Sequence, residues 1–382
     1  MKKILSLLLV VVMIFSLTAC AQQPAETPNE EKPATETPAE DGKPYKAALL
    51  LNGTLGDKSF FDSANSGLEQ LKSELGNKFE FKVEQMGATP ADEPKWAPTL
   101  MEYCESEEYD VIIVGTWQMI DGLKEASEQF PDQKFIFFDE TYDFETNPNE
   151  NIYNALYKQN EVSFLVGAAA AMMTTNDKLE NIDPSTKVIG FLGGMENPVI
   201  NDFLVGYIQG AKTVDPEIKV QIGYVGNFYD SAAGKEIALA QYQSGGVDVG
   251  YNVAGGAGLG QIEAAVDANK YAFGVDSDQA ALLQDKAHVI PTSALKNVGA
   301  SIYQAIKLHI EGKLEFGKAE SYGFSEGGVE LVKDAHYEEM LPEEIRTKLD
   351  ELEQKIISGE IKVDTALGKS TEEIQAIKDS VK

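Results

Sequence analysis

Short apolar runs alternate with helical segments in two successive series, and this alternation most limits the folds open to the chain. The runs of the first series are 47–51, 79–83, 109–114 and 134–139. Those of the second are 188–192, 220–225, 247–253 and 271–276. Runs rich in Val, Ile and Phe are typical of strands buried on both faces, as in parallel sheets covered by helices. We therefore predict an α/β fold with two doubly wound parallel-sheet lobes.

Ligands of such sheets bind at the carboxyl ends of the strands. In two facing lobes these ends line one cleft, and we predict the ligand there. We assign residues 44–158 and about 297–323 to lobe 1. Residues 159–296 and about 324–382 form lobe 2, with a hinge between the lobes.

The N-terminus has the pattern of an exported and lipidated protein. A short basic region precedes an apolar run at 4–15, which is too short for a transmembrane helix and suits a signal peptide. Small residues before Cys20 match a lipobox, with an ordinary secretory signal as the alternative. We predict a signal peptide at 1–19, a lipidated Cys20 and a disordered tether over 20–43. The protein would then lie on the extracytoplasmic face of the cell membrane, held only by its lipid.

Charge and composition exclude several classes of function. The chain carries 62 acidic residues against 32 Lys and Arg, so it lacks the basic surface that nucleic acids require. Only Cys104 follows Cys20, and the three histidines lack metal-ligand spacing. Residues 323–327 have the letters of a nucleophile elbow, but no buried strand leads into them and no clear helix follows. We expect no metal, no cofactor and no enzymatic activity.

Acidic and aromatic residues gather where the predicted strands end. Asp139 and Asp276 each end a run, and a carboxylate there can accept hydrogen bonds from a vicinal diol, as in ribose. A turn-forming Asp is the plain alternative. The aromatic residues Phe60, Phe61 and Phe228 follow other strands, and they can line the cleft or pack into the core.

Small and basic residues complete the strand ends. Gly255 and Gly256 would let backbone approach a ligand, and the segment lacks the Lys-Ser or Lys-Thr of a Walker loop. Lys296 follows the last strand of the second series, where a surface lysine is the alternative. Ser59 is placed to cap the helix after the first strand.

These segments together resemble the basic membrane protein family of lipoproteins, the solute-binding components of ABC nucleoside importers. The resemblance covers about residues 45–363 and rests on segments 56–60, 160–167, 206–210, 254–256, 275–278 and 357–361. It implies a type I periplasmic-binding-protein fold with a nucleoside in the cleft.

The resemblance also implies roles for single residues. The base would stack between Phe60 and Phe228, and Asp139 would lie at the ligand in lobe 1. Asp276 and Lys296 would hold the ribose hydroxyls, with Gly255 approaching by its backbone. The other residues expected at the ligand are Asn52, Asp57, Lys58, Phe61, Trp117 and Gly256.

Some positions depart from the family pattern. Asn52 stands where the family usually has an Asp that contacts the base, and Phe61 stands where it usually has Asn. The loop from Asn52 to Asp57 is one residue short, and Trp117 adds an aromatic ring. Because Asn offers both a donor and an acceptor, it can read a base edge differently from Asp.

We therefore expect a monomeric, lipid-anchored protein that binds a nucleoside, preferentially a purine, and delivers it to an ABC transporter permease. One alternative is another flat or hydroxylated ligand, such as a flavin-like ring or a sugar. A second is a sensor that reports its ligand without import.

Overall fold

The structure is a computed structural model that describes residues 42–382. The predicted signal peptide, Cys20 and all but the last two residues of the predicted tether lie outside this range. The described residues form one compact unit. Within residues 42–382, no helix combines the length and apolar character needed to cross a membrane.

The first sheet contains six strands in the order β11-β5-β4-β3-β1-β2, and every neighbouring pair is parallel. The strands are β1 (Tyr45–Leu51), β2 (Phe79–Gln85), β3 (Val111–Gly115), β4 (Phe135–Phe138), β5 (Ile152–Tyr157) and β11 (Lys318–Tyr322). Its register places Ala47 of β1 beside Phe81 on one side and Val111 on the other.

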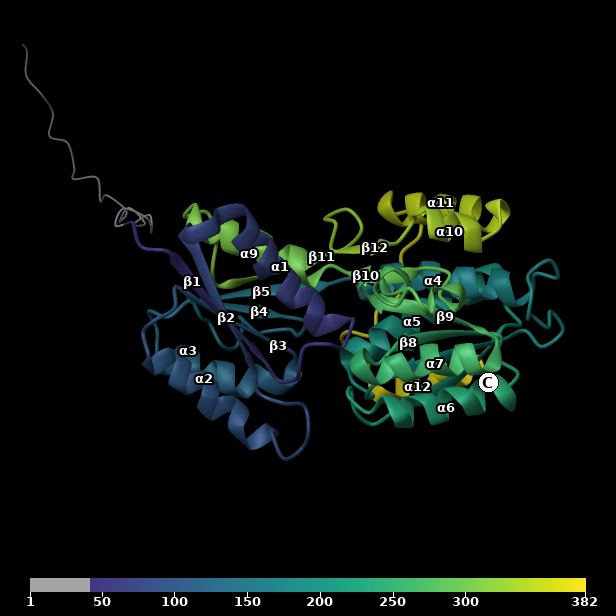
Figure 1. Cartoon of the computed structure of the whole chain (residues 1–382), viewed down its shortest axis with the longest axis horizontal. Coiled ribbons are helices and arrows are strands. Elements are labelled where there is room, and N and C mark those ends of the chain that lie inside the picture. The colour runs from purple at the N-terminus through teal and green to yellow at the C-terminus, as the bar shows by residue number, and fades with distance from the viewer. Residues whose placement is uncertain (1–41) are drawn as a thin grey trace, which may run out of the picture. The chain divides into compact units, whose positions relative to one another are not determined.

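Alternate residues of β1 build the two layers that cover this sheet. Ala47 and Leu49 pack with α1 (Phe60–Leu75) and α9 (Val298–Ile310), whereas Ala48 and Leu50 pack with the helices of the opposite face. Those helices are α2 (Trp96–Glu105) and α3 (Ile120–Gln129), and the two layers are seen above and below the strands in Figure 1. We call the sheet with these helices the first lobe.

The second sheet has the order β12-β10-β9-β8-β6-β7. The strands are β6 (Val188–Gly193), β7 (Lys219–Tyr224), β8 (Val249–Val253), β9 (Tyr271–Asp276), β10 (Ser293–Lys296) and β12 (Val329–Leu331). Only β12 runs antiparallel, at the sheet edge beside β10. The predicted α/β architecture with two parallel-dominated sheets is confirmed.

Helices cover both faces of the second sheet, and together they form the second lobe. One layer contains α4 (Gln159–Thr174) and α5 (Pro198–Val214), and the other contains α6 (Ser231–Gln243) and α7 (Leu259–Ala268). The remaining helices are α8 (Gln279–Leu282), α10 (Ala335–Met340), α11 (Glu343–Ile357) and α12 (Thr371–Asp379). Short 3₁₀ turns are η1 (Gly76–Lys78), η2 (Glu93–Lys95), η3 (Trp117–Met119), η4 (Gly255–Gly258) and η5 (Ala287–Val289).

Glycines let α4 and α5 pack backbone against backbone. A Cβ on Gly206 would lie 2.2 Å from the carbonyl oxygen of Asn160, and one on Gly167 would lie 2.0 Å from that of Tyr207. The segments 160–167 and 206–210, which carry part of the family resemblance, are therefore the two sides of one helix–helix contact.

The chain crosses between the lobes three times. The crossings follow β5, which leads into α4, then β10, which leads into α9, and finally β11, which leads into β12. The predicted lobe boundaries, 44–158 with 297–323 and 159–296 with 324–382, follow these crossings, and we retain them as a proposal.

Candidate ligand-binding cleft

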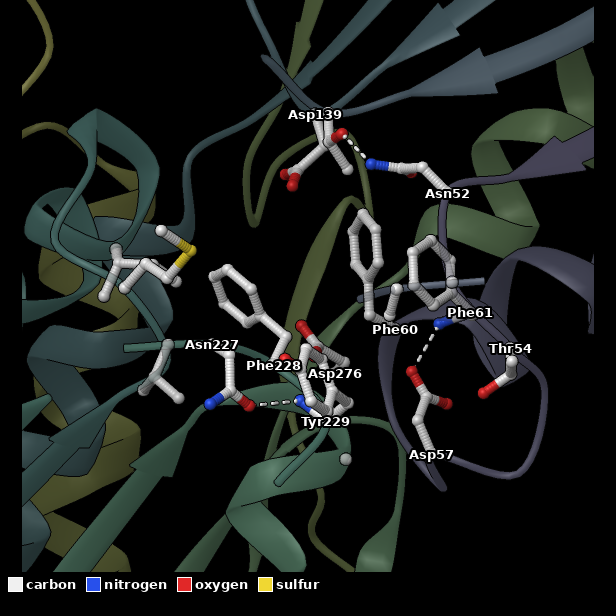
Figure 2. A pocket seen from close by; sticks show the side chains of 18 of the residues that line it. Asn52, Thr54, Asp57, Phe60, Phe61, Asp139, Asn227, Phe228, Tyr229 and Asp276 are labelled. Atoms are coloured by element: carbon white, nitrogen blue, oxygen red, sulfur yellow. Dashed lines mark hydrogen bonds between the residues drawn. The ribbon is translucent and has the colours of Figure 1, made fainter. Parts of the chain in front are cut away.

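A cavity of about 310 Å³ lies where strand ends of both sheets come together. It is lined from the first lobe by the segments after β1, β3 and β4, and from the second by those after β6, β7 and β8 and by the ends of β9 and β10. This volume lies at the lower end of the roughly 300–1,000 Å³ that is usual for small-molecule sites. Figure 2 shows the side chains that surround it.

The structure brings nearly all predicted ligand residues to this cavity. Those that line it are Asn52, Asp57, Phe60, Phe61, Trp117, Asp139, Phe228, Gly255, Gly256, Asp276 and Lys296. Lys58 does not line it: its side chain is 43% exposed and its Nζ lies 4.0 Å from Asp62. The backbone of Lys58 does contact the second lobe, because its carbonyl accepts a hydrogen bond from Gln279.

Three strand ends at the cavity have an unusual backbone. Thr116, Asp139 and Asp276 follow or end β3, β4 and β9, and all three have positive φ, at 72°, 68° and 61°. Non-glycine residues adopt such conformations rarely, and the strain is most often found at functional sites. In all three cases the residue with positive φ places its polar side chain at the cavity wall.

A buried ion pair joins the two lobes at the cavity. The Nζ of Lys296, at the end of β10, lies 2.6 Å from Oδ1 of Asp139 in the first lobe, and both side chains are almost fully buried. The ammonium group also lies 4.7 Å from the ring centre of Phe60 and 5.1 Å from that of Phe203. Cation–π contact and the carboxylate together offset the cost of burying this charge.

Carboxylates outnumber basic groups in the cavity. Burial raises the pKa of Asp139 to about 6 although Lys296 opposes the shift, and burial likewise raises the pKa of Asp276. Burial also raises the pKa of Asp57 to about 6, against three backbone N–H donors. Lys296 is the only basic residue among those lining the cavity. Such a site suits a ligand rich in hydrogen-bond donors and disfavours a phosphate group.

In the loop after β1, Asp57 and Ser59 form hydrogen bonds that differ from the predicted ones. Asp57 caps α1, because its carboxylate accepts hydrogen bonds from the backbone N–H groups of Ser59, Phe61 and Asp62. The bond to Phe61 is drawn in Figure 2. The predicted cap by Ser59 was wrong: its hydroxyl donates to Oδ2 of Asp276 at 2.5 Å. With Asp57 already bound to the free N–H groups, the serine hydroxyl is available to the other lobe.

Aromatic rings flank the cavity from both lobes. Phe60 comes from the start of α1, Phe228 from the segment after β7, and the two lie on different sides of the space in Figure 2. Phe60 packs edge-on against Phe61, with ring centres 5.2 Å apart. Trp117 reaches from the first lobe to Phe228, with ring centres 6.1 Å apart.

The side-chain amide of Asn52 forms hydrogen bonds with its neighbours through its nitrogen only. Its Nδ2 donates to Oγ1 of Thr116 at 2.8 Å and to Oε1 of Gln118 at 3.0 Å. Its Oδ1 is buried and accepts no hydrogen bond from the described residues. A buried acceptor without a donor is costly, so this oxygen favours a ligand that supplies an N–H or O–H group.

Several lining residues were missed from the sequence. The largest group follows β6, a predicted strand at whose end no ligand residue was predicted. The missed residues include Thr116, Gln118, Met195, Asn197, Ile200, Phe203 and Asn227. The same strand-end rule that found Asp139 would have found Met195 and Asn197.

Residues 45–366 match the sequence profile of a family described as "ABC transporter substrate-binding protein PnrA-like". The chain belongs to this family. The PnrA-like profile ends before α12, so that helix lies beyond the shared region. Membership confirms the resemblance to basic membrane proteins and makes this chain an ABC transporter substrate-binding protein. Among residues 42–382, no three His, Cys, Asp or Glu residues gather as a metal site would require.

Several known proteins are similar to this chain over most of their length. The chain is 32% identical to Basic membrane protein A of Borreliella burgdorferi over 319 residues, covering 83% of this chain and 86% of that protein. It is 30% identical over 326 residues to the ABC transporter nucleoside-binding protein BmpA of Lactococcus lactis, covering 81% and 88%. A solved solute-binding protein of an ABC transporter system from Aeropyrum pernix superposes with a TM-score of 0.74 at 26% identity, over 88% of this chain and all of that chain.

Proposed function

We propose that this protein binds a nucleoside, preferentially a purine nucleoside, and delivers it to the permease of an ABC importer. It acts as a monomer on the extracytoplasmic face of the membrane, held by a lipid on Cys20. One observation carries the proposal: a cavity with aromatic rings from both lobes also contains buried carboxylates that can accept hydrogen bonds from hydroxyl groups. The name of the Lactococcus lactis relative supports the same ligand class.

The aromatic rings supply affinity for the base. A base between Phe60 and Phe228 would stack on one ring from each lobe, and stacking is typically worth about 1–3 kcal/mol per base. Trp117 adds a third ring beside Phe228. Since a base in this position needs both lobes, stacking favours the closed protein.

The charged side chains of the cavity orient the sugar. Asp276 and Lys296 would contact the ribose hydroxyls, the first by accepting hydrogen bonds and the second by donating them. Asp139 keeps the ammonium group of Lys296 in place. Gly255, which has a positive φ of 54°, lets the backbone of η4 approach the ligand without a side chain between them.

The base edge would meet Asn52. Because its Nδ2 is already bonded to Thr116 and Gln118, Oδ1 remains as the acceptor for a ligand donor. The ring N–H of a 6-oxopurine is such a donor. This arrangement supports a preference for inosine and guanosine over adenosine.

Titration calorimetry on residues 42–382 tests the proposal. The panel contains inosine, guanosine, adenosine, uridine, riboflavin, ribose and inosine monophosphate, applied after carried-over ligand is removed by unfolding and refolding. We expect purine nucleosides to bind most tightly, and the monophosphate to bind at least tenfold more weakly because its charge meets buried carboxylates.

Three variants give the controls. Phe60→Ala and Asp276→Ala should each weaken nucleoside binding by at least tenfold, through lost stacking and lost hydroxyl contacts. Lys58→Ala should bind like the wild type, because that side chain faces away from the cavity. Absence of heat with every nucleoside would overturn the proposal, and binding of riboflavin or ribose instead would reassign the ligand.

A further inference from the structure

Two loops of different lobes are hydrogen-bonded to each other beside the cavity. Residues 57–59 follow β1, and residues 275–279 include the end of β9. Ser59 donates to Asp276, Ser277 donates to the carbonyl of Ser59 at 3.0 Å, and Gln279 donates to the carbonyl of Lys58 at 3.1 Å. Both Ser59 and Gln279 are completely buried, whereas Ser277 and Lys58 are partly exposed.

Within this contact, only one bond reaches a side chain that lines the cavity. Asp276 lines the cavity, whereas Ser59, Ser277 and Gln279 do not. Among the hydrogen bonds of residues 42–382, that from Ser59 is the only one that the Asp276 carboxylate accepts. Lys296 acts on Asp276 by charge, but its own hydrogen bond goes to Asp139.

The geometry has a simple chemical consequence. The serine hydroxyl takes up one carboxylate oxygen, Oδ2, and fixes the plane of the group. The other oxygen is then left to accept from a ligand. Because Ser59 belongs to the first lobe and Asp276 to the second, this orientation exists only when the lobes are in contact.

We propose that Ser59 is a positioning residue of the ligand site, whose hydroxyl fixes the Asp276 carboxylate as the lobes close. The hydroxyl-accepting group is thus assembled by closure, and a ligand held by it favours the closed state in return. The identity of the ligand rests on the proposed function, whereas the Ser59–Asp276 interaction can be tested with any ligand that closes the lobes.

Ser277 provides a matched control. Its hydroxyl also crosses between the lobes, in the same pair of loops, but it ends on a backbone carbonyl. Ser59→Ala removes the bond to Asp276 and a longer contact, 3.5 Å, with the carbonyl of Val275. Ser277→Ala also removes a hydrogen bond between the lobes, but it does not change the surroundings of the carboxylate.

The first experiment measures nucleoside affinity from neutral to acidic pH by calorimetry. Ser59→Ala should bind roughly tenfold more weakly at neutral pH, since a hydrogen bond to a buried charged group is lost. The hydroxyl lowers the pKa of Asp276, so its loss raises that pKa further. Binding by Ser59→Ala should then fail at a higher pH than in the wild type, because the ionised carboxylate is the hydrogen-bond acceptor. Ser277→Ala should keep the wild-type pH profile.

The second experiment separates this inference from the ligand assignment. The protein is labelled with ¹³C at aspartate Cγ and saturated with whichever compound of the calorimetry panel binds, so that the lobes are closed. The Asp276 signal is identified by its absence in Asp276→Asn and titrated by NMR. Its midpoint should rise in Ser59→Ala and stay unchanged in Ser277→Ala. If riboflavin or ribose binds in place of nucleosides and this shift is found, the proposed function fails and the positioning role stands.

Equal titration midpoints in Ser59→Ala and wild type would overturn the inference, and so would identical pH profiles of binding in the two serine variants. If Ser59→Ala does not fold, Ser59→Cys keeps a side chain of similar size with a much weaker donor. It should shift the Asp276 midpoint in the same direction.

Discussion

At the residue scale, the cavity concentrates charge that would be more stable in water. Asp57 is bonded to the start of α1, Asp139 to Lys296 and Asp276 to Ser59, so each carboxylate has a protein partner. Even so, burial raises the pKa of all three. Solute-binding proteins gain function from such costly groups, because a ligand that supplies more donors relieves part of the cost.

The burial of Asp139 predicts a pH dependence of stability. Because the pKa of Asp139 is raised from 3.8 in the unfolded chain to about 6 in the folded protein, the folded state binds the proton more tightly. Its contribution to stability is therefore present below the unfolded value and is lost as the pH rises through about 6.

Urea unfolding of the wild type and of Asp139→Asn from about pH 4 to pH 7 measures the contribution of Asp139 to the free energy of unfolding. The free energy of unfolding of the wild type, relative to the variant, should fall by about 2–3 kcal/mol across this range. A difference between the two proteins that does not vary with pH would contradict the prediction.

At the element scale, the sequence predicts best where burial alone decides the structure. Runs such as 111–115 became strands because they are apolar on both faces. Four strands were not predicted. The polar β11 lies at an edge, β12 contains three residues and β10 contains four. The fourth, β5, has a buried Asn154 in its middle, whose amide is bonded to Phe137, Glu140 and Tyr142.

The misassigned cap on α1 has the same origin. A rule that considers only neighbouring residues assigned the Ser59 hydroxyl to the start of α1. Its hydrogen-bond partner, Asp276, lies 217 residues away in the chain. Pairings of this kind depend on how the two lobes meet, and no pattern within one segment contains that information. Most of the cavity could be predicted because strand ends share one edge of a sheet, whereas the bonds between its side chains could not.

The contact between α4 and α5 provides a prediction at this scale. Gly206→Ala would place a methyl group 2.2 Å from the carbonyl oxygen of Asn160 and force the helices apart. We expect a loss of about 1–3 kcal/mol in the free energy of unfolding. Nucleoside binding should weaken as well, because Ile200 and Phe203 of α5 line the cavity.

Gly122→Ala in α3 is the control for this substitution. Its new methyl group would find its nearest neighbour at 3.2 Å, on the Ala97 side chain, and its helix does not line the cavity. Better helix propensity offsets part of the cost of this tight contact, so its loss of stability should be clearly smaller than that of Gly206→Ala. Equal denaturation midpoints for both glycine variants would disprove the packing argument.

At the scale of the whole molecule, binding depends on the two lobes meeting around the ligand. The ion pair of Lys296 with Asp139, the bond from Ser59 to Asp276 and the contact of Trp117 with Phe228 each join one lobe to the other. All three pairs contain residues that line the cavity. Closure and ligand contact are consequently made by the same groups.

The two tryptophans allow this closure to be observed. Trp96 is buried in the core of the first lobe, whereas Trp117 lies at the cavity and contacts the second lobe. In Trp96→Phe protein, a saturating nucleoside should change the intensity or wavelength of the remaining emission. Unchanged emission at concentrations where calorimetry shows full binding would contradict the assigned position of Trp117.

The threefold crossing of the chain also governs the order in which the protein can be assembled. Helix α9 and strand β11, which complete the first lobe, come from residues 298–322, after nearly all strands of the second lobe. During synthesis or export from the N-terminus, β1 to β5 therefore appear long before α9, which together with α1 covers one of their faces. Until then, the apolar side chains that pack against α9 are exposed and open to association with other chains. The second lobe's own sheet, which contains β6 to β10 in an uninterrupted stretch, faces no such delay for most of its strands.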